Sequence, residues 1–344
     1  MVSIIIICYN QEKSIARALD SVLCQDSSIP YEIVIGDDAS TDSTRDICAR
    51  YAERFSDIVR VLPEEPNLGL VGNYFRCLKA CRGEYISDCA GDDEWTGATR
   101  LPDAMKIFGS HPEVNVVYTD YLISDSASGS SRQAYGSDPA SYKNCRITKG
   151  NDLLKMILDR TGSLPYMLSA AVYRRKDLEE VMTEAYDMVC NETFGCEDVP
   201  IMAALASKGD AAFNPAVTLK YNITGGSISN NSDRLKSSRF YLKSLRMSRI
   251  LGKYYRVPES EMTGTYSTKS LYLASAAFDT ADADLTSEII NEISYWTLKP
   301  SIKTRLYLSL AQNPILRDCF RHIKHLYKNK RTEKPLLNRR TEMM

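Results

Sequence analysis

Apolar residues in the first ninety positions follow two alternating patterns. VSIIIICY (Val2–Tyr9) is a continuous β-branched run, which is typical of a strand buried on both faces of a sheet. After it, Ile15, Leu19 and Val22 recur at the spacing of one apolar helix stripe. The strand pattern returns at Tyr31–Asp37, Asp57–Leu62 and Gly83–Asp88, with helical periodicity before each. This alternation predicts an α/β fold with a mostly parallel sheet covered by helices on both faces.

The rest of the chain extends this pattern and then changes it. Further helices are expected at Leu101–Phe108, Asp152–Asp159 and from Glu197, and further strands at Val114–Ile123, Ser169–Tyr173 and Val217–Ile223. Ser124–Asn144 is rich in Ser, Gly and Asp and is expected to be a long polar loop. From Asn231 the pattern is helical, with Pro258, Pro300 and Pro314 between helices. We expect an α/β domain over residues 1–231, with halves 1–112 and 113–231, and a helical region over residues 232–344.

Composition narrows the class of protein. The 344 residues carry a net charge of −1, so the whole molecule is not an electrostatic trap for nucleic acid. No apolar run reaches the length of roughly 18 residues that a membrane span needs, and the apolar start is too short for a signal peptide. The ten cysteines include no C-x-x-C pair. We therefore expect reduced thiols and a cytoplasmic protein.

Three polar clusters follow three of the predicted strands. They are CYN after the first strand, GDDAST at Gly36–Thr41 and AGDDEW at Ala90–Trp95. Either Ser40 or Asp42 could simply cap the next helix, which would explain one cluster. The carboxyl ends of parallel strands meet at one edge of a sheet, where ligands bind. Together the three clusters predict a cleft lined by carboxylates.

The acids at the end of the fourth strand repel one another. Asp92, Asp93 and Glu94 are consecutive, so water, a basic partner or a cation must offset their charge. Carboxylate oxygens suit Mg²⁺ or Mn²⁺, whose remaining positions are usually filled by water and substrate phosphates. The sequence contains neither a G-x-x-x-x-G-K-[ST] loop nor G-x-G-x-x-G, which argues against P-loop and dinucleotide-binding enzymes. Asp92 and Asp93 are the predicted cation site.

Four segments together resemble the family 2 glycosyltransferases of the GT-A fold. They are VSIIIICYNQEKSIARALDSVLCQ, EIVIGDDASTDST, NLGLVGNYFRCLKACRGEYISDCAGDDEW and CEDVPIM, and the resemblance covers about Met1–Asn231. It implies a Rossmann-like catalytic domain followed by the helical region. It also implies an inverting, metal-dependent transfer of a sugar from a nucleoside diphosphate, UDP being the favoured one, to a glycan or lipid-linked glycan in cell-surface polysaccharide synthesis.

The resemblance also implies residue roles. The nucleotide contacts would be Tyr9, Asn10 and Asp38, with Asn73 lining the base pocket, Asp92 reaching the ribose or the cation, and Asp93 ligating the cation. Asp198 matches the general base, with Glu197 beside it. For this acidic pair the alternative is an ordinary helix N-terminus, where acids favour the dipole. Trp95 is the candidate contact to the sugar or acceptor.

The chain departs from the family pattern in two places. Gly72 stands where an Arg is common, and Asn222 and Thr224 stand where relatives have a Tyr-Arg-x-His run. A contact from Tyr221–Ser229 to the cation or diphosphate is therefore open, with Ser227 and Ser229 as possible replacements.

The C-terminal segment is strongly basic. Arg317–Arg340 holds nine Lys and Arg against two acids, which fits either a solvated tail or attachment to anionic lipid on the inner face of a cell membrane. Cys319, His322 and His325 are spaced by three, and we interpret them as a solvated face rather than a metal site. Two other functions remain open. One is a sugar-phosphate nucleotidyltransferase, and the other is a non-catalytic module that binds sugar nucleotides or glycans.

Overall fold

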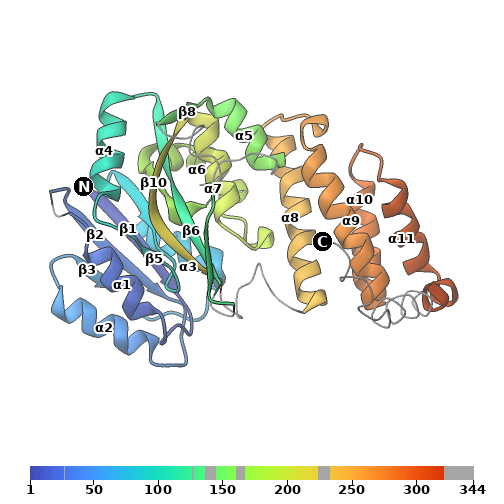
Figure 1. The fold of residues 1–344 in the computed structure, drawn as a ribbon, viewed down its shortest axis with the longest axis horizontal. Helices are drawn as coiled ribbons and strands as arrows, with labels where there is room; N and C mark the ends of the chain where they lie inside the picture. Colours follow the sequence, from blue (N-terminus) through green and yellow to red (C-terminus); the bar gives the residue numbers. More distant parts are fainter. Residues whose placement is uncertain (27, 126–127, 136–144, 160–166, 224–232, 321–344) are drawn as a thin grey trace, which may run out of the picture.

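The computed structural model describes residues 1–26, 28–125, 128–135, 145–159, 167–223 and 233–320. A sheet flanked by helices forms one part of the molecule, and helices α8 to α11 lie beside it along the longest axis (Figure 1). The mixed, mostly parallel α/β architecture with additional C-terminal helices confirms the predicted fold class.

The main sheet path runs in the order β3-β2-β1-β4-β9-β6-β10-β5. Strands β1 to β4 are mutually parallel, while β9 runs antiparallel to both β4 and β6. β6 and β10 are parallel to each other, and the short β5 pairs antiparallel with β10. The described strands are β1 Val2–Cys8, β2 Tyr31–Asp37, β3 Val59–Val61, β4 Tyr85–Asp88, β5 Glu94–Trp95, β6 Val114–Asp125, β7 Ser130–Gln133, β8 Arg146–Thr148, β9 Ala171–Arg174 and β10 Asp210–Ile223.

Strand side chains alternate between two apolar cores. Ile4 and Ile6 of β1 join the core that includes α1, α2 and α4, whereas Ile5 points to the opposite core with α3 and α5 to α7. A β-branched run without polar interruptions thus reflects burial on both faces. The helices of this part are α1 Ile15–Leu23, α2 Thr44–Arg54, α3 Gly69–Ala80, α4 Arg100–Ser110, α5 Gly150–Asp159, α6 Arg175–Val189 and α7 Asp198–Lys208.

The C-terminal helices share a core with the sheet. One apolar cluster runs from the helices on this face of the sheet into α8 Arg234–Tyr254, α9 Thr263–Thr280, α10 Ala283–Ser294 and α11 Ile302–Gln312. At its edge, Asp159 Oδ1 at the end of α5 accepts hydrogen bonds from the Gly264 and Thr265 N–H groups at the start of α9. The boundary predicted near residue 231 therefore separates two regions that are packed together.

The structure also corrects the expected polar loop at Ser124–Asn144. β6 continues to Asp125, and Ser130–Gln133 forms β7, which pairs antiparallel with it. Asp120 stabilises this hairpin, since Oδ2 accepts from Gln133 Nε2 at 2.7 Å and Oδ1 from the Tyr135 N–H at 3.2 Å. Residues 126–127 and 136–144 lie outside the described ranges.

Two other expectations concern the whole chain. The ten cysteines all lie within the described residues, and no disulfide bond joins any of them there. Within the described ranges, every helix is too short or too polar to cross a bilayer.

Candidate functional site

The loops after β1 and β2 are hydrogen-bonded to each other. Asn10 adopts a left-handed backbone conformation, with φ of 52°, and its N–H donates to Ser40 Oγ at 2.9 Å. Asn10 Oδ1 in turn accepts from the Thr41 N–H at 2.8 Å. Tyr9 is half exposed beside this junction. Two of the predicted nucleotide residues, Tyr9 and Asn10, therefore lie together at the sheet edge, with their loop fixed by the GDDAST turn.

Asp38 and Asn73 form a buried support for this edge. Asp38 Oδ1 accepts from the Leu68 N–H at 2.7 Å, which holds the loop before α3 against β2. Asn73 Nδ2 donates to the Gly36 carbonyl at 2.8 Å. Gly36 is required here, because a Cβ would collide with Cys77 Sγ and approach Asn73 Oδ1 at 2.7 Å. Asn73 is thus buried beside the end of β2, with its amide already engaged by the protein.

Glu94 in the acidic turn is neutralised by basic neighbours. Arg17 Nε lies 3.3 Å from Glu94 Oε1, and Lys220 Nζ lies 3.1 Å from the same oxygen. Burial raises the pKa of Glu94, but the hydrogen bonds and charges of these neighbours and of Asn222 outweigh it, so the net pKa is lowered. Of the three consecutive acids, this one therefore has its counter-charge within the protein.

Neither Asp92 nor Asp93 forms an ion pair with any residue in the described ranges. Burial raises the pKa of both carboxyl groups, and the negative charge of Asp92 raises that of Asp93 further. Asp93 is 2% exposed, and its Oδ1 accepts the Asn222 N–H at 3.0 Å. Two adjacent carboxyl groups held against their mutual repulsion are a donor set that a hard divalent cation fits. No cluster of three or more His, Cys, Asp or Glu ligands occurs in the described residues, so water and phosphate would complete the coordination.

Asn222, one of the departures from the family pattern, holds the acidic turn in place. Its Nδ2 donates to the Asp92 carbonyl at 2.8 Å and to Glu94 Oε1 at 3.1 Å. Lys220 lies two residues earlier on β10 and also binds Glu94. Residues two apart on a strand point to the same face, so this spacing was the sequence signal that Lys220 and Asn222 act together. Thr224, Ser227 and Ser229 lie outside the described residues.

Trp95 occupies the core beneath this turn. It is 4% exposed, its Nε1 donates to the Asp88 carbonyl at 3.1 Å, and the Arg100 guanidinium lies 4.2 Å from its ring centroid. The structure does not support the predicted contact of Trp95 with the sugar, because its indole ring is packed against the protein.

The acidic pair Glu197–Asp198 begins α7. Asp198 is partly exposed, and its Oδ1 accepts the Val199 N–H at 2.7 Å. Glu197 Oε2, by contrast, is buried without a hydrogen-bond partner among the described residues. Burial, and then the charge of Asp198, raises the pKa of Glu197 to about 8. Glu197 is therefore largely protonated at neutral pH.

A buried polar cluster connects this helix start to the end of β4. The Tyr74 and Tyr173 hydroxyls are 2.7 Å apart, and the charges of Asp88 and Glu197 both act on Tyr173. Burial raises the pKa of Asp88 to about 8, although the Tyr74 hydroxyl and the Arg100 charge oppose the shift. Asp88 also adds to the raised pKa of Glu197, so the helix start lies near the sheet edge that carries the acidic turn. An acid ending an otherwise apolar strand was the sequence signal for this cluster.

We expect Asp88→Asn to reduce the loss of stability as the pH rises. The folded state retains the Asp88 proton up to about pH 8, whereas the unfolded chain releases it near 3.8. Between these two pH values the folded state binds one proton more than the unfolded chain. The free energy of unfolding therefore falls by up to about 1.4 kcal/mol for each unit of rising pH. The amide does not titrate, so the variant should gain stability relative to wild type from pH 5 to pH 8. Urea unfolding at both pH values measures this, and parallel changes in the two proteins would contradict it.

The fold and the carboxylate-lined edge define a GT-A-type α/β protein, and the comparisons with known proteins agree. The sequence profile described as Glycosyl transferase family 2 matches residues 3–182, just over half of the chain. The chain belongs to this family.

Similar proteins share different portions of the chain. An uncharacterized protein of Mycobacterium tuberculosis is 41% identical over 116 residues, which are 34% of this chain and 34% of that protein. An uncharacterized glycosyltransferase of Nostoc sp. is 30% identical over 181 residues, 52% of each protein. The chain thus spans about a third to a half of the length of these relatives. The crystal structure of S. aureus TarS in complex with UDP-GlcNAc shares the fold, with a TM-score of 0.60, 18% identity, and coverage of 96% of this chain and 92% of that one.

Proposed function

We propose that this protein is an inverting glycosyltransferase that uses a divalent cation and a nucleoside diphosphate sugar, with a UDP-sugar as the favoured donor. The acceptor would be a hydroxyl of a glycan or lipid-linked glycan, in the synthesis of a cell-surface polysaccharide. One observation carries the proposal: two adjacent carboxyl groups, the partly exposed Asp92 and the buried Asp93, lie at the ligand-binding edge of a family 2 fold, and both have a raised pKa.

Donor binding is assigned to the edge formed by β1, β2 and the acidic turn. Tyr9 and Asn10 would contact the nucleotide, Asp38 would accept a hydrogen bond from the base, and Asn73 would support the pocket from below. Asp92 would reach the ribose or the cation, and Asp93 would ligate Mg²⁺ or Mn²⁺. When bound, the cation would stabilise the charge of the departing diphosphate.

Asp198 is the proposed general base. A carboxylate within hydrogen-bond reach takes the proton of the acceptor hydroxyl as the new glycosidic bond forms. Attack on the face opposite the leaving diphosphate inverts the anomeric carbon, so no protein nucleophile is needed. The partial exposure of Asp198 supports this role, and the buried oxygen and raised pKa of Glu197 argue for Glu197 as a neutral neighbour.

A panel of nucleotide sugars tests the function directly. We expect at least one UDP-, GDP- or dTDP-sugar to be hydrolysed slowly without acceptor, and only when Mg²⁺ or Mn²⁺ is present. Release of the nucleoside diphosphate is the measurement, with chelator as the control. Binding without turnover for every sugar, with and without candidate glycans, would favour a non-catalytic module.

The basic tail gives a separate prediction about membranes, which also bears on the proposed cytoplasmic, peripheral location. Removing Lys324–Met344 deletes seven Lys and Arg and two Glu, all outside the described residues. Each basic residue near an anionic surface contributes on the order of 1 kcal/mol, and salt screens this attraction. We expect the truncated protein to bind anionic vesicles more weakly, and binding of the full chain to fall with added salt. Equal vesicle binding by both proteins would show a merely solvated tail.

A further inference from the structure

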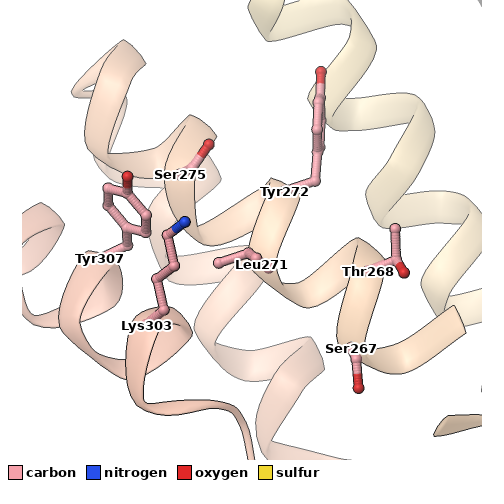
Figure 2. Close-up of a pocket in the computed structure, with 7 residues that line it drawn as sticks. All are labelled: Ser267, Thr268, Leu271, Tyr272, Ser275, Lys303 and Tyr307. Carbon is pink, nitrogen blue, oxygen red and sulfur yellow. The ribbon is translucent and has the colours of Figure 1, made fainter. Parts of the chain in front are cut away.

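A surface groove separates α9 from α11, away from the candidate active site. Its volume is about 530 Å³, within the usual range for ligand sites. Leu271 of α9 lies opposite Lys303 and Tyr307 of α11 (Figure 2), and the lining is completed by four more α9 residues, Ser267, Thr268, Tyr272 and Ser275. The groove thus combines an apolar floor with hydroxyl groups and one ammonium group.

Lys303 gives the groove its charge. Figure 2 shows this side chain rising from α11 between Tyr307 and Leu271. It forms no ion pair with any residue in the described part of the chain. Arg234 of α8 adds a second cation beside the groove, because its Nη2 donates to Ser275 Oγ and its guanidinium lies 4.5 Å over the Tyr272 ring, but it also pairs with Asp279 at 3.5 Å. A cation beside several hydroxyl donors fits an anionic oxygen ligand such as a phosphate.

The outer face of α11 is unusually apolar for a surface. Ile302 is 79% exposed and Leu306 is 52% exposed, and their spacing of four places them on one helix face. Ile315, Leu316 and Phe320 are exposed in the helical segment that follows. These five are nearly half of the eleven large apolar side chains that are exposed in the described residues, so such side chains are concentrated in residues 302–320 of the chain.

Basic residues accompany this patch. Residues 299–320 contain Lys299, Lys303, Arg305 and Arg317 against the single acid Asp318. The chain then continues into the basic tail. Apolar side chains next to cations match the boundary between acyl chains and anionic headgroups of a lipid leaflet.

We propose that the groove between α9 and α11 binds the phosphate headgroup of an anionic membrane lipid, while Ile302 and Leu306 enter the acyl boundary beside it. Lys303 contacts the phosphate, and the hydroxyl groups of Ser275 and Tyr307 donate to its oxygens. The inference builds on the proposed membrane contact of the tail, which it supplements with a defined headgroup site. It does not depend on sugar transfer.

The test measures binding of the full chain to vesicles of phosphatidylcholine with and without phosphatidylglycerol. Ile302→Ser combined with Leu306→Ser should weaken binding to the anionic vesicles at least about tenfold, because two apolar insertions are lost. Lys303→Gln should weaken it about fivefold. Lys253→Gln on α8 and Tyr186→Ser on α6 remove a comparable exposed cation and an exposed aromatic ring outside the patch, and both should bind like wild type.

Three outcomes would overturn the proposal. The first is wild-type vesicle binding by both the Ile302→Ser and Leu306→Ser protein and the Lys303→Gln protein. The second is a Lys303→Gln protein that no longer binds soluble glycerol 3-phosphate, which wild type binds saturably, but still binds vesicles. That result would assign the groove to a free phosphate ester. The third is that wild type sediments as a dimer while the Ile302→Ser and Leu306→Ser protein sediments as a monomer. That result would assign the apolar patch to contact with a second copy of the chain. Vesicle binding is scored separately from nucleotide-sugar turnover, so failure of the groove and failure of the proposed transferase activity remain distinguishable.

Discussion

Asp198→Asn should slow sugar transfer by about 10²- to 10⁴-fold, the usual contribution of a positioned general base. The amide keeps the size of the side chain and can still accept the Val199 N–H through its oxygen, so α7 should begin as before. What it loses is the ability to take the acceptor proton. Binding of the donor should change little, because the nucleotide contacts are assigned to β1, β2 and the acidic turn. Initial rates and donor titrations on the same preparation measure the two effects separately.

Glu197→Gln is the matched control for this variant. The raised pKa of Glu197, about 8, means that its carboxyl group is largely neutral at pH 7, and Gln mimics that neutral form. We expect the rate of this variant to stay within about tenfold of wild type, well short of the loss expected for a general base. A near-normal rate for Asp198→Asn together with a large loss for Glu197→Gln would exchange the two roles. Loss of donor binding in Asp198→Asn would instead place Asp198 in the nucleotide pocket.

Asp93→Ala should abolish the stimulation of UDP binding by Mn²⁺. Removing a residue that merely supports a metal ligand typically costs 10- to 100-fold in metal affinity, so loss of the ligand itself should exceed roughly 100-fold. The fold should survive, since the change removes a buried carboxyl group whose raised pKa shows an unfavourable charge. Asp93→Asn preserves an acceptor for the Asn222 N–H and separates loss of the cation from loss of that hydrogen bond. Calorimetry with UDP, with and without Mn²⁺, is the measurement.

Glu94→Gln provides the comparison within the same turn. Arg17, Lys220 and Asn222 already satisfy this acid, so it is not needed to hold a cation. Its variant should retain the metal dependence of UDP binding. An Asp93→Ala protein that keeps wild-type affinity and metal dependence would remove Asp93 from the cation site, and loss of metal dependence in Glu94→Gln alone would transfer the assignment to Glu94.

The sequence by itself determined the main buried strands, most of the helices that cover them and the acids at the sheet edge, but not the short strands β5, β7 and β8 or the helix α6. Val2–Cys8 is apolar at consecutive positions because its side chains alternate into two separate cores, and such burial leaves a local pattern. The polar clusters at Asp38 and Asp92 follow strand ends for an equally local reason, since parallel strands deliver their carboxyl ends to one edge. Family 2 membership rests on these same segments, within residues 3–182.

Only the tertiary structure decided which acids are compensated. Asn222 and Lys220 reach the acidic turn because β10 pairs with β5 at the edge of the sheet, a contact spanning well over a hundred residues that no local pattern encodes. The same holds for Glu197, whose raised pKa depends on its burial and on the charges of Asp198 and Asp88. The groove between α9 and α11 also follows from packing alone, because helical periodicity shows which faces are apolar but does not show which partner covers them.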